Sequence, residues 1–146
     1  MRAVGVAVLV VSLAVAAYAD YDYGQQPAGG TEPAWKVQAR TAAQHANFAA
    51  GADSMSSAEQ HLGHALNCIE GPRGPNFNRA WGNPCEGQGN GLLPDLRASR
   101  TGSSWILVAE AAGELAVKGV RSRDLAQRRN AARGVAQLLQ LVAEGR

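Results

Sequence analysis

Apolar residues recur at helical spacing along four stretches of the chain. In the first, from Pro33 to Ala50, they fall three or four residues apart, as on one face of a helix. These positions are Trp35, Ala39, Ala42, Ala46 and Ala49. Because most of them are alanine, we expect the element that packs on this face to approach closely.

A second apolar stripe follows a polar break at residues 51–54. Ser56 and Glu59 have the spacing of a capping box, which predicts that a new helix begins there. Gly71 followed by Pro72 is typical of a helix end. The stripe between these signals consists of Leu62, Ala65, Leu66 and Ile69.

Two more stripes occupy the C-terminal part of the chain, with a turn predicted between them at residues 119–122. The third stripe is Trp105, Val108, Ala109, Ala112, Leu115 and Ala116, and the fourth is Leu125, Ala132, Val135, Ala136, Leu139 and Val142. No stretch alternates apolar and polar residues as a strand does. The pattern predicts an all-α protein, an up-and-down helical bundle of four helices or of three with a long first helix.

Arg128 interrupts the apolar stripe of the last predicted helix. A long arginine side chain near a helix end can pack its stem on apolar surface and carry its guanidinium to water. We therefore expect Arg128 to reach the surface, and the alternative is a buried ion pair with a carboxylate.

Residues 71–95 have a different composition from the helical stretches. They are rich in Gly, Pro and Asn, which do not sustain a helix or a strand. A loop of this length in a compact domain is commonly functional. We predict an ordered loop that could contact a protein partner.

The N-terminal residues resemble a secretory signal peptide. Arg2 precedes an apolar run at residues 3–16, and Ala17 and Ala19 provide the small residues that a signal peptidase requires before a cleavage at Asp20. The run is shorter than the roughly 20 residues that span a bilayer, so no membrane span is expected after cleavage. The predicted organisation is a signal peptide at 1–19, a flexible leader at 20–32 and a single helical domain at 33–146, in a secreted or periplasmic protein.

Cys68 and Cys85 are the only two cysteines. Outside the cytoplasm they are expected to form a disulfide. It would close a loop of about 16 residues, for which chain entropy gives about 3 kcal/mol of stabilisation. Without a C-x-x-C motif, neither thioredoxin-type chemistry nor covalent haem attachment is available. The alternative is a pair of free thiols that act as metal ligands or as a nucleophile.

Composition narrows the possible functions. The length of 146 residues fits one domain, and 46% hydrophobic residues suffice for a packed core. A net charge of +2 and only 5% aromatic residues do not indicate a nucleic-acid partner. The glycines of the loop lack the Gly-Lys-Ser/Thr ending of a phosphate-binding loop, and no G-x-S-x-G motif is present. We find no catalytic constellation and do not expect an enzyme.

The histidines are the strongest candidates for chemistry. His61, His64 and Cys68 follow at i, i+3 and i+7, so they lie on one side of the second helix, beside its apolar stripe. Two imidazoles one turn apart can bind a single Zn²⁺, Cu²⁺ or Ni²⁺, or serve as haem ligands. The motif lacks the internal glutamate of H-E-x-x-H zinc proteases. The spacing therefore predicts a binding site and not a protease.

His45 joins this site only if the chain reverses. A reversal at Gly51–Ser54 would bring His45 level with His61 across an antiparallel hairpin, whereas a continuous helix would point it away. Glu59 or Asp53 could add an oxygen ligand. The alternative for all the histidines is structural: they would hydrogen-bond the following loop in an interaction protein that has no ligand.

Overall fold

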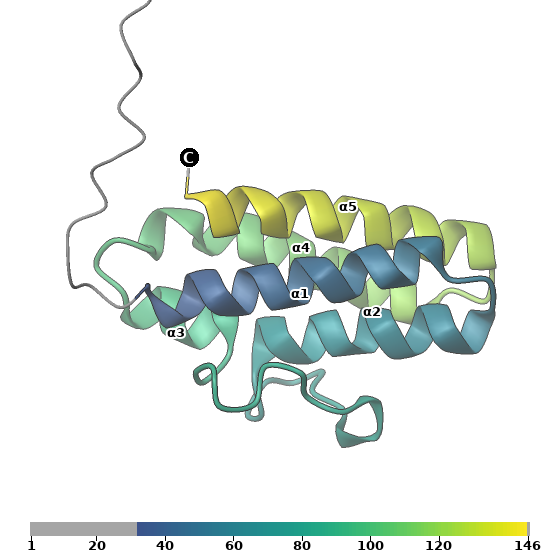
Figure 1. Ribbon diagram of the computed structural model, residues 1–146, viewed down its shortest axis with the longest axis horizontal. Helices are drawn as coiled ribbons and strands as arrows, with labels where there is room; N and C mark the ends of the chain where they lie inside the picture. Colours follow the sequence, from purple (N-terminus) through teal and green to yellow (C-terminus); the bar gives the residue numbers. More distant parts are fainter. Residues whose placement is uncertain (1–31, 146) are drawn as a thin grey trace, which may run out of the picture. The chain divides into compact units, whose positions relative to one another are not determined.

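The computed structural model describes residues 32–145, and in this part of the chain all regular secondary structure is helical (Figure 1). The α-helices are α1 (Ala34–Gly51), α2 (Met55–Glu70), α3 (Leu92–Ala98), α4 (Ile106–Arg121) and α5 (Leu125–Glu144), and two 3-10 turns lie at Arg79–Trp81 and Ser103–Trp105. The prediction of an all-α protein is confirmed. The predicted signal peptide, and the leader apart from Glu32, lie outside the described residues.

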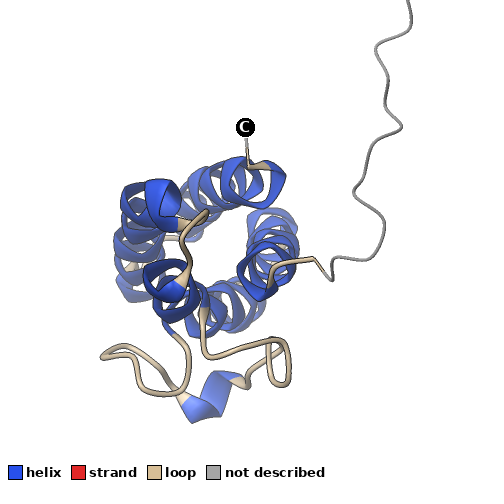
Figure 2. Cartoon of the chain, turned by 90° about the vertical axis from the view of Figure 1, so that its left-hand side faces the viewer, coloured by secondary structure: helices blue, strands red, loops and turns tan. Residues whose placement is uncertain are grey.

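The long helices pack side by side as a helical bundle. Helix α1 packs against both α2 and α5, and α4 packs against α5 and α2 (Figures 1 and 2). Residues 52–54 separate α1 from α2, so a single long first helix is excluded. None of the helices in the described part is both long enough and apolar enough to span a membrane.

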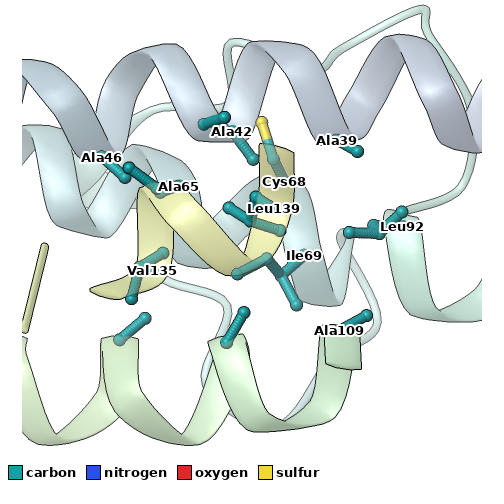
Figure 3. Close-up of a cluster of buried hydrophobic side chains, with 14 of the residues drawn as sticks. Ala39, Ala42, Ala46, Ala65, Cys68, Ile69, Leu92, Ala109, Val135 and Leu139 are labelled. Atoms are coloured by element: carbon teal, nitrogen blue, oxygen red, sulfur yellow. The ribbon is translucent and has the colours of Figure 1, made fainter. Parts of the chain in front are cut away.

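The core is built on the small side chains of α1. Ala39, Ala42, Ala46 and Ala49 have no exposed surface, as the stripe predicts. Figure 3 shows three of these alanines in one cluster with Ile69 of α2 and with larger apolar side chains of other helices. Because an alanine extends only one methyl group from the backbone, the neighbouring helices lie close to α1.

Helix α3 and the length of α4 differ from the sequence prediction. Helix α3 begins at Leu92, inside the predicted loop, and buries Leu92 and Leu96 completely. Two leucines one turn apart are too few to show a helical period, so burial in the tertiary structure stabilises this helix.

The predicted turn at Gly119 is wrong, because α4 continues through it to Arg121. A Cβ on Gly119 would lie 2.5 Å from Cδ2 of Leu62, so the glycine there permits close packing.

The start of α2 also differs in detail. Ser54 is the N-cap residue, and its Oγ accepts a hydrogen bond from the Ser57 N–H at 3.1 Å. The predicted capping box of Ser56 and Glu59 is therefore wrong. Glu59 instead accepts a hydrogen bond from Arg128.

Arg128 is buried, with 3% of its surface exposed, so the expectation that it reaches solvent is wrong. It donates hydrogen bonds to the carbonyls of Met55, Gly119, Val120 and Ser122 and forms an ion pair with Glu59. These partners belong to the start of α2, the end of α4 and the turn before α5. One side chain therefore joins three elements of the bundle, and its buried charge is fully hydrogen-bonded.

The loop at residues 71–91, hereafter the 71–91 loop, projects from the bundle beside α2 (Figure 2). The predicted disulfide between Cys68 and Cys85 is confirmed and ties this loop to the end of α2, with 5.3 Å between the two Cα atoms. Gly71 has a φ of 72° and Gly91 a φ of 119°. A Cβ on Gly91 would lie 2.6 Å from the Gly71 Cα atom, so only glycine allows the two ends of the loop to meet.

Replacing Arg128 tests the importance of its hydrogen bonds. We expect Arg128→Ala to lower the free energy of unfolding by about 3 kcal/mol, because it leaves several buried carbonyls without a donor. Glu59→Gln is the matched control and should cost about 1 kcal/mol or less, since Glu59 is half-exposed and an amide oxygen still accepts. Urea unfolding followed by circular dichroism measures both, and equal effects of the two variants would contradict this role.

The disulfide gives a second prediction. Protein purified without reductant should have a mass two hydrogen atoms below that of the dithiol form and should not react with a thiol-alkylating reagent under denaturing conditions. Intact-mass spectrometry before and after reduction measures this difference. Two reactive thiols in the unreduced sample would contradict the pairing.

Candidate metal centre

Three histidine side chains meet on one flank of the α1–α2 hairpin. His45 comes from α1, and His61 and His64 lie one turn apart on α2. The ring centroids of His45 and His64 are 4.7 Å apart, and those of His45 and His61 are 5.7 Å apart. The chain reversal on which the contribution of His45 depends is present, and it brings the three rings together.

The ring nitrogens are close enough to share one ion. One nitrogen from each ring can be chosen so that all three lie within 4.8 Å of one another, and the Nδ1 atoms of His45 and His64 are 3.2 Å apart. Nitrogens bound at 2.0–2.1 Å to a tetrahedral metal are about 3.3 Å apart. The separations of up to 4.8 Å exceed this spacing by about 1.5 Å, so small side-chain movements would bring the three nitrogens to the spacing of zinc ligands.

Nδ1 of His61 is buried and makes no hydrogen bond with the described residues. A buried polar atom without a partner costs about 1–3 kcal/mol. A metal ion between the rings would provide a partner for a nitrogen lone pair. This atom is therefore a polar group of the cluster that has no hydrogen-bond partner among the described residues.

His64 is held by neighbouring groups on its other side. Its Nε2 atom lies 3.1 Å from Nε2 of Gln60, which also donates to the main-chain carbonyl of Trp81 at 2.7 Å. The Nε2 side of His64 thus faces the main chain at Trp81 and Gly82. Because an amide N–H donates and cannot accept, the Gln60 contact makes Nε2 of neutral His64 an acceptor and places its proton on Nδ1, toward Nδ1 of His45.

The surroundings favour the neutral form of two of the three rings, His45 and His64. Burial, followed by the positive charges of His64 and His61, lowers the pKa of His45 from 6.5 to about 4. Burial is also the main cause that lowers the pKa of His64, and its hydrogen bond at Trp81 partly opposes the shift. A neutral imidazole has the free lone pair that a metal ligand requires.

The other residues that the sequence suggested do not join the cluster. Cys68 is in the disulfide, Glu59 is paired with Arg128, and Asp53 lies exposed in the turn between α1 and α2. The group therefore offers three nitrogens and no carboxylate or thiolate.

Sequence reasoning missed two neighbours of the cluster. Phe48, which is 48% exposed, has its ring centroid 5.4 Å from that of His61 and lies one turn from His45 on α1. Gln60 lies one turn before His64 on α2. Helical spacing relative to the histidines was the available signal for both residues.

Comparison of the chain with protein-family models, with curated proteins and with solved structures gave no match. The function is therefore inferred from the chemistry of the site itself.

The low pKa of His45 predicts how the stability of the metal-free protein changes with pH. An unfolded histidine has a pKa near 6.5, so at pH 4–6.5 the unfolded chain binds a proton at this position that the folded chain excludes. The contribution of neutral His45 to stability is present above pH 6.5 and is lost as the pH falls from about 6.5 to about 4.

His45→Gln, which cannot be protonated in this range, should therefore lose less stability than the parent between pH 7.5 and pH 4.5. Urea midpoints at the two pH values measure the difference, and the carboxylates common to both proteins cancel in the comparison. Parallel losses would show that His45 does not favour its neutral form in the folded protein.

Proposed function

We propose that this chain is an exported metal-binding protein in which His45, His61 and His64 bind one divalent transition-metal ion. The observation that carries the proposal is the meeting of all three histidines of the sequence at one place, from two helices. The lowered pKa values of His45 and His64 and the unpartnered Nδ1 of His61 support it.

The donor set favours Zn²⁺, Cu²⁺ or Ni²⁺. Imidazole nitrogen suits these ions, whereas Ca²⁺ and Mg²⁺ prefer oxygen ligands, which the group does not contain. Among the three ions the intrinsic order of affinity places Cu²⁺ first. Haem is less well supported, because the histidine rings contact one another and a porphyrin could enter only by separating them.

Three protein ligands leave one position of a tetrahedral metal open to water or to an exogenous ligand. The exposed ring of Phe48 lies beside the cluster, so the open position would face a partly apolar surface. We propose a binding role, not a catalytic one, because we identify no general base beside the ligands.

The scaffold in this proposal is an up-and-down bundle of the four long helices, secreted or periplasmic after removal of residues 1–19. The signal-peptide pattern supports export, and the disulfide is compatible with an oxidising compartment. A buried arginine and a disulfide would hold such a scaffold together in the absence of metal.

One observation favours a second function. His64 contacts the 71–91 loop through the main chain at Trp81, as it would if the histidines only braced this loop for a protein partner. In the part of the chain that the structure describes, the rings of His45 and His61 contact each other, His64 and Phe48, and no ring contact joins them to the loop. A bracing role therefore accounts for His64 but not for the meeting of all three rings.

Titration with metal tests the proposal. The folded chain should bind one Zn²⁺, Cu²⁺ or Ni²⁺ per molecule at pH 7.5, as measured by isothermal titration calorimetry. Each of His45→Ala, His61→Ala and His64→Ala should weaken binding by more than about 100-fold, since loss of a ligand costs more than loss of a group that orients one. The parent should gain about 2.7 kcal/mol of stability at a metal concentration of 100 Kd.

Gln44→Ala, an exposed substitution next to His45 on α1, is the matched control and should bind like the parent. Unchanged affinity in His45→Ala would contradict a three-histidine site. A parent that binds none of these ions, together with a His61→Ala/His64→Ala variant that loses its cooperative melt, would favour the bracing function.

A further inference from the structure

We propose that Gln60 is a positioning residue that opposes metal binding, because its amide keeps the proton of His64 on Nδ1, the nitrogen that a shared metal ion needs. This inference rests on the proposed metal-binding function and deepens it. It predicts that the parent protein binds metal less tightly than the same three imidazoles would without Gln60. The bound ion is then more easily released than a site of three free imidazoles would allow.

The 71–91 loop fixes the orientation of the Gln60 amide. Nε2 of Gln60 lies 2.7 Å from the main-chain carbonyl oxygen of Trp81. A carbonyl oxygen only accepts hydrogen bonds, so the amide nitrogen and not the amide oxygen must occupy this position. The same nitrogen lies 3.1 Å from Nε2 of His64. Since the amide nitrogen has two N–H groups and accepts nothing, it donates one to each neighbour.

The Gln60 contact determines which nitrogen of His64 carries the proton. A neutral imidazole has one N–H group and one acceptor nitrogen. Because Nε2 accepts from Gln60, the proton lies on Nδ1, which is 3.2 Å from Nδ1 of His45 and donates to it. A chain of hydrogen bonds therefore links the Trp81 carbonyl, Gln60, His64 and His45.

A metal ion shared with His45 would have to bind His64 through Nδ1. This nitrogen faces His45, at a separation close to the spacing of about 3.3 Å between nitrogen ligands of tetrahedral zinc. Nε2 lies on the loop side of the ring, where a Cβ on Gly82 would be 3.5 Å from it. Metal binding therefore requires the proton to leave Nδ1 and a proton from water to bind Nε2, so that the ring stays neutral.

Gln60 cannot accept this moved proton while it bonds Trp81. A proton on Nε2 of His64 would meet an N–H group of Gln60, so two donors would face each other. A half-turn of the amide would present its oxygen to His64 but would place the same oxygen against the Trp81 carbonyl, where two acceptors repel. Metal binding must therefore break the contacts of Gln60, and their free energy opposes it.

The experiment compares three variants of the full-length mature protein with the parent. Gln60→Ala removes the amide, and water in its place can donate or accept, so it selects neither tautomer of His64. Gln60→Glu replaces the donor by a carboxylate, which only accepts and therefore favours the proton on Nε2. Gln44→Glu is the matched control, because it adds the same charge at an exposed position next to His45 and leaves the Gln60 contacts in place.

Two readouts are taken at pH 7.5: the affinity for Zn²⁺ by calorimetry, and the tautomer of His64 before metal is added, from its imidazole ¹⁵N shifts. In the parent, His64 should carry its proton on Nδ1. Gln60→Ala should bind Zn²⁺ about 3–10-fold more tightly than the parent, the effect of one opposing hydrogen bond. Gln60→Glu should carry the His64 proton on Nε2 and should bind Zn²⁺ more tightly than Gln44→Glu.

The sign of the effect separates this inference from a merely structural role of Gln60, which would leave the affinity unchanged or lower it when the contact is lost. If the parent binds Zn²⁺ but Gln60→Ala does not bind it more tightly, the inference is overturned and the metal function stands. A proton on Nε2 of His64 in the parent overturns the inference as well. If the parent binds no Zn²⁺, the metal function and the inference that rests on it both fail. Gln60 is exposed, so its variants should fold like the parent, which circular dichroism checks.

Discussion

The close approach of helices to the alanine face of α1 is the constraint on which the rest of the structure depends. Four alanines with no exposed surface allow α2 and α5 to pack at a short distance from the backbone of α1, because each side chain is a single methyl group. At that distance a half-buried side chain on α1 can touch one on α2. His45 reaches His61 and His64 for this reason, and larger residues at the alanine positions would move the rings apart.

A core of small side chains gains little hydrophobic free energy from each of its contacts. An alanine buries much less apolar surface than a leucine, so each such contact contributes little hydrophobic free energy. The protein supplements it with buried polar groups that have defined partners: Gln38 bonds Asp95 and the Gly91 N–H, Asn67 holds the loop, and Arg128 joins three elements. Such groups tolerate few alternative arrangements, because each lost partner leaves a buried donor or acceptor unpaired. They therefore fix the path of segments that have little hydrophobic content of their own.

The contrast between apolar packing and buried polar contacts also explains which features the sequence could predict. Helical periodicity and the Gly71–Pro72 signal were sufficient to predict the long helices, and the cysteine count with the predicted export was sufficient to predict the disulfide, because these depend on local pattern or on simple pairing. The burial of Arg128 with a carboxylate was only the alternative in the sequence interpretation, and its main-chain acceptors could not be predicted, since the tertiary fold alone brings them together. For the site, His61 and His64 followed from spacing, and His45 depended on a reversal that the sequence left open. The contact of the Trp81 carbonyl beside the site could not be predicted, because every residue has a main-chain carbonyl.

The two parts of the candidate site are assembled by different interactions. The ligands come together through the packing of α1 on α2, and only a short turn separates those helices, so the entropy of closing that hairpin is small. Beside His64 lies the 71–91 loop, which contributes little to the apolar core and is held by Asn67 and the disulfide, and its Trp81 carbonyl accepts from Gln60, the residue that donates to His64. Loss of the loop contacts would therefore leave the packing of α1 on α2, and with it the meeting of the three rings, in place. Since the free energy of metal binding depends strongly on ligand orientation, a change far too small to unfold the bundle could still alter the affinity of the site.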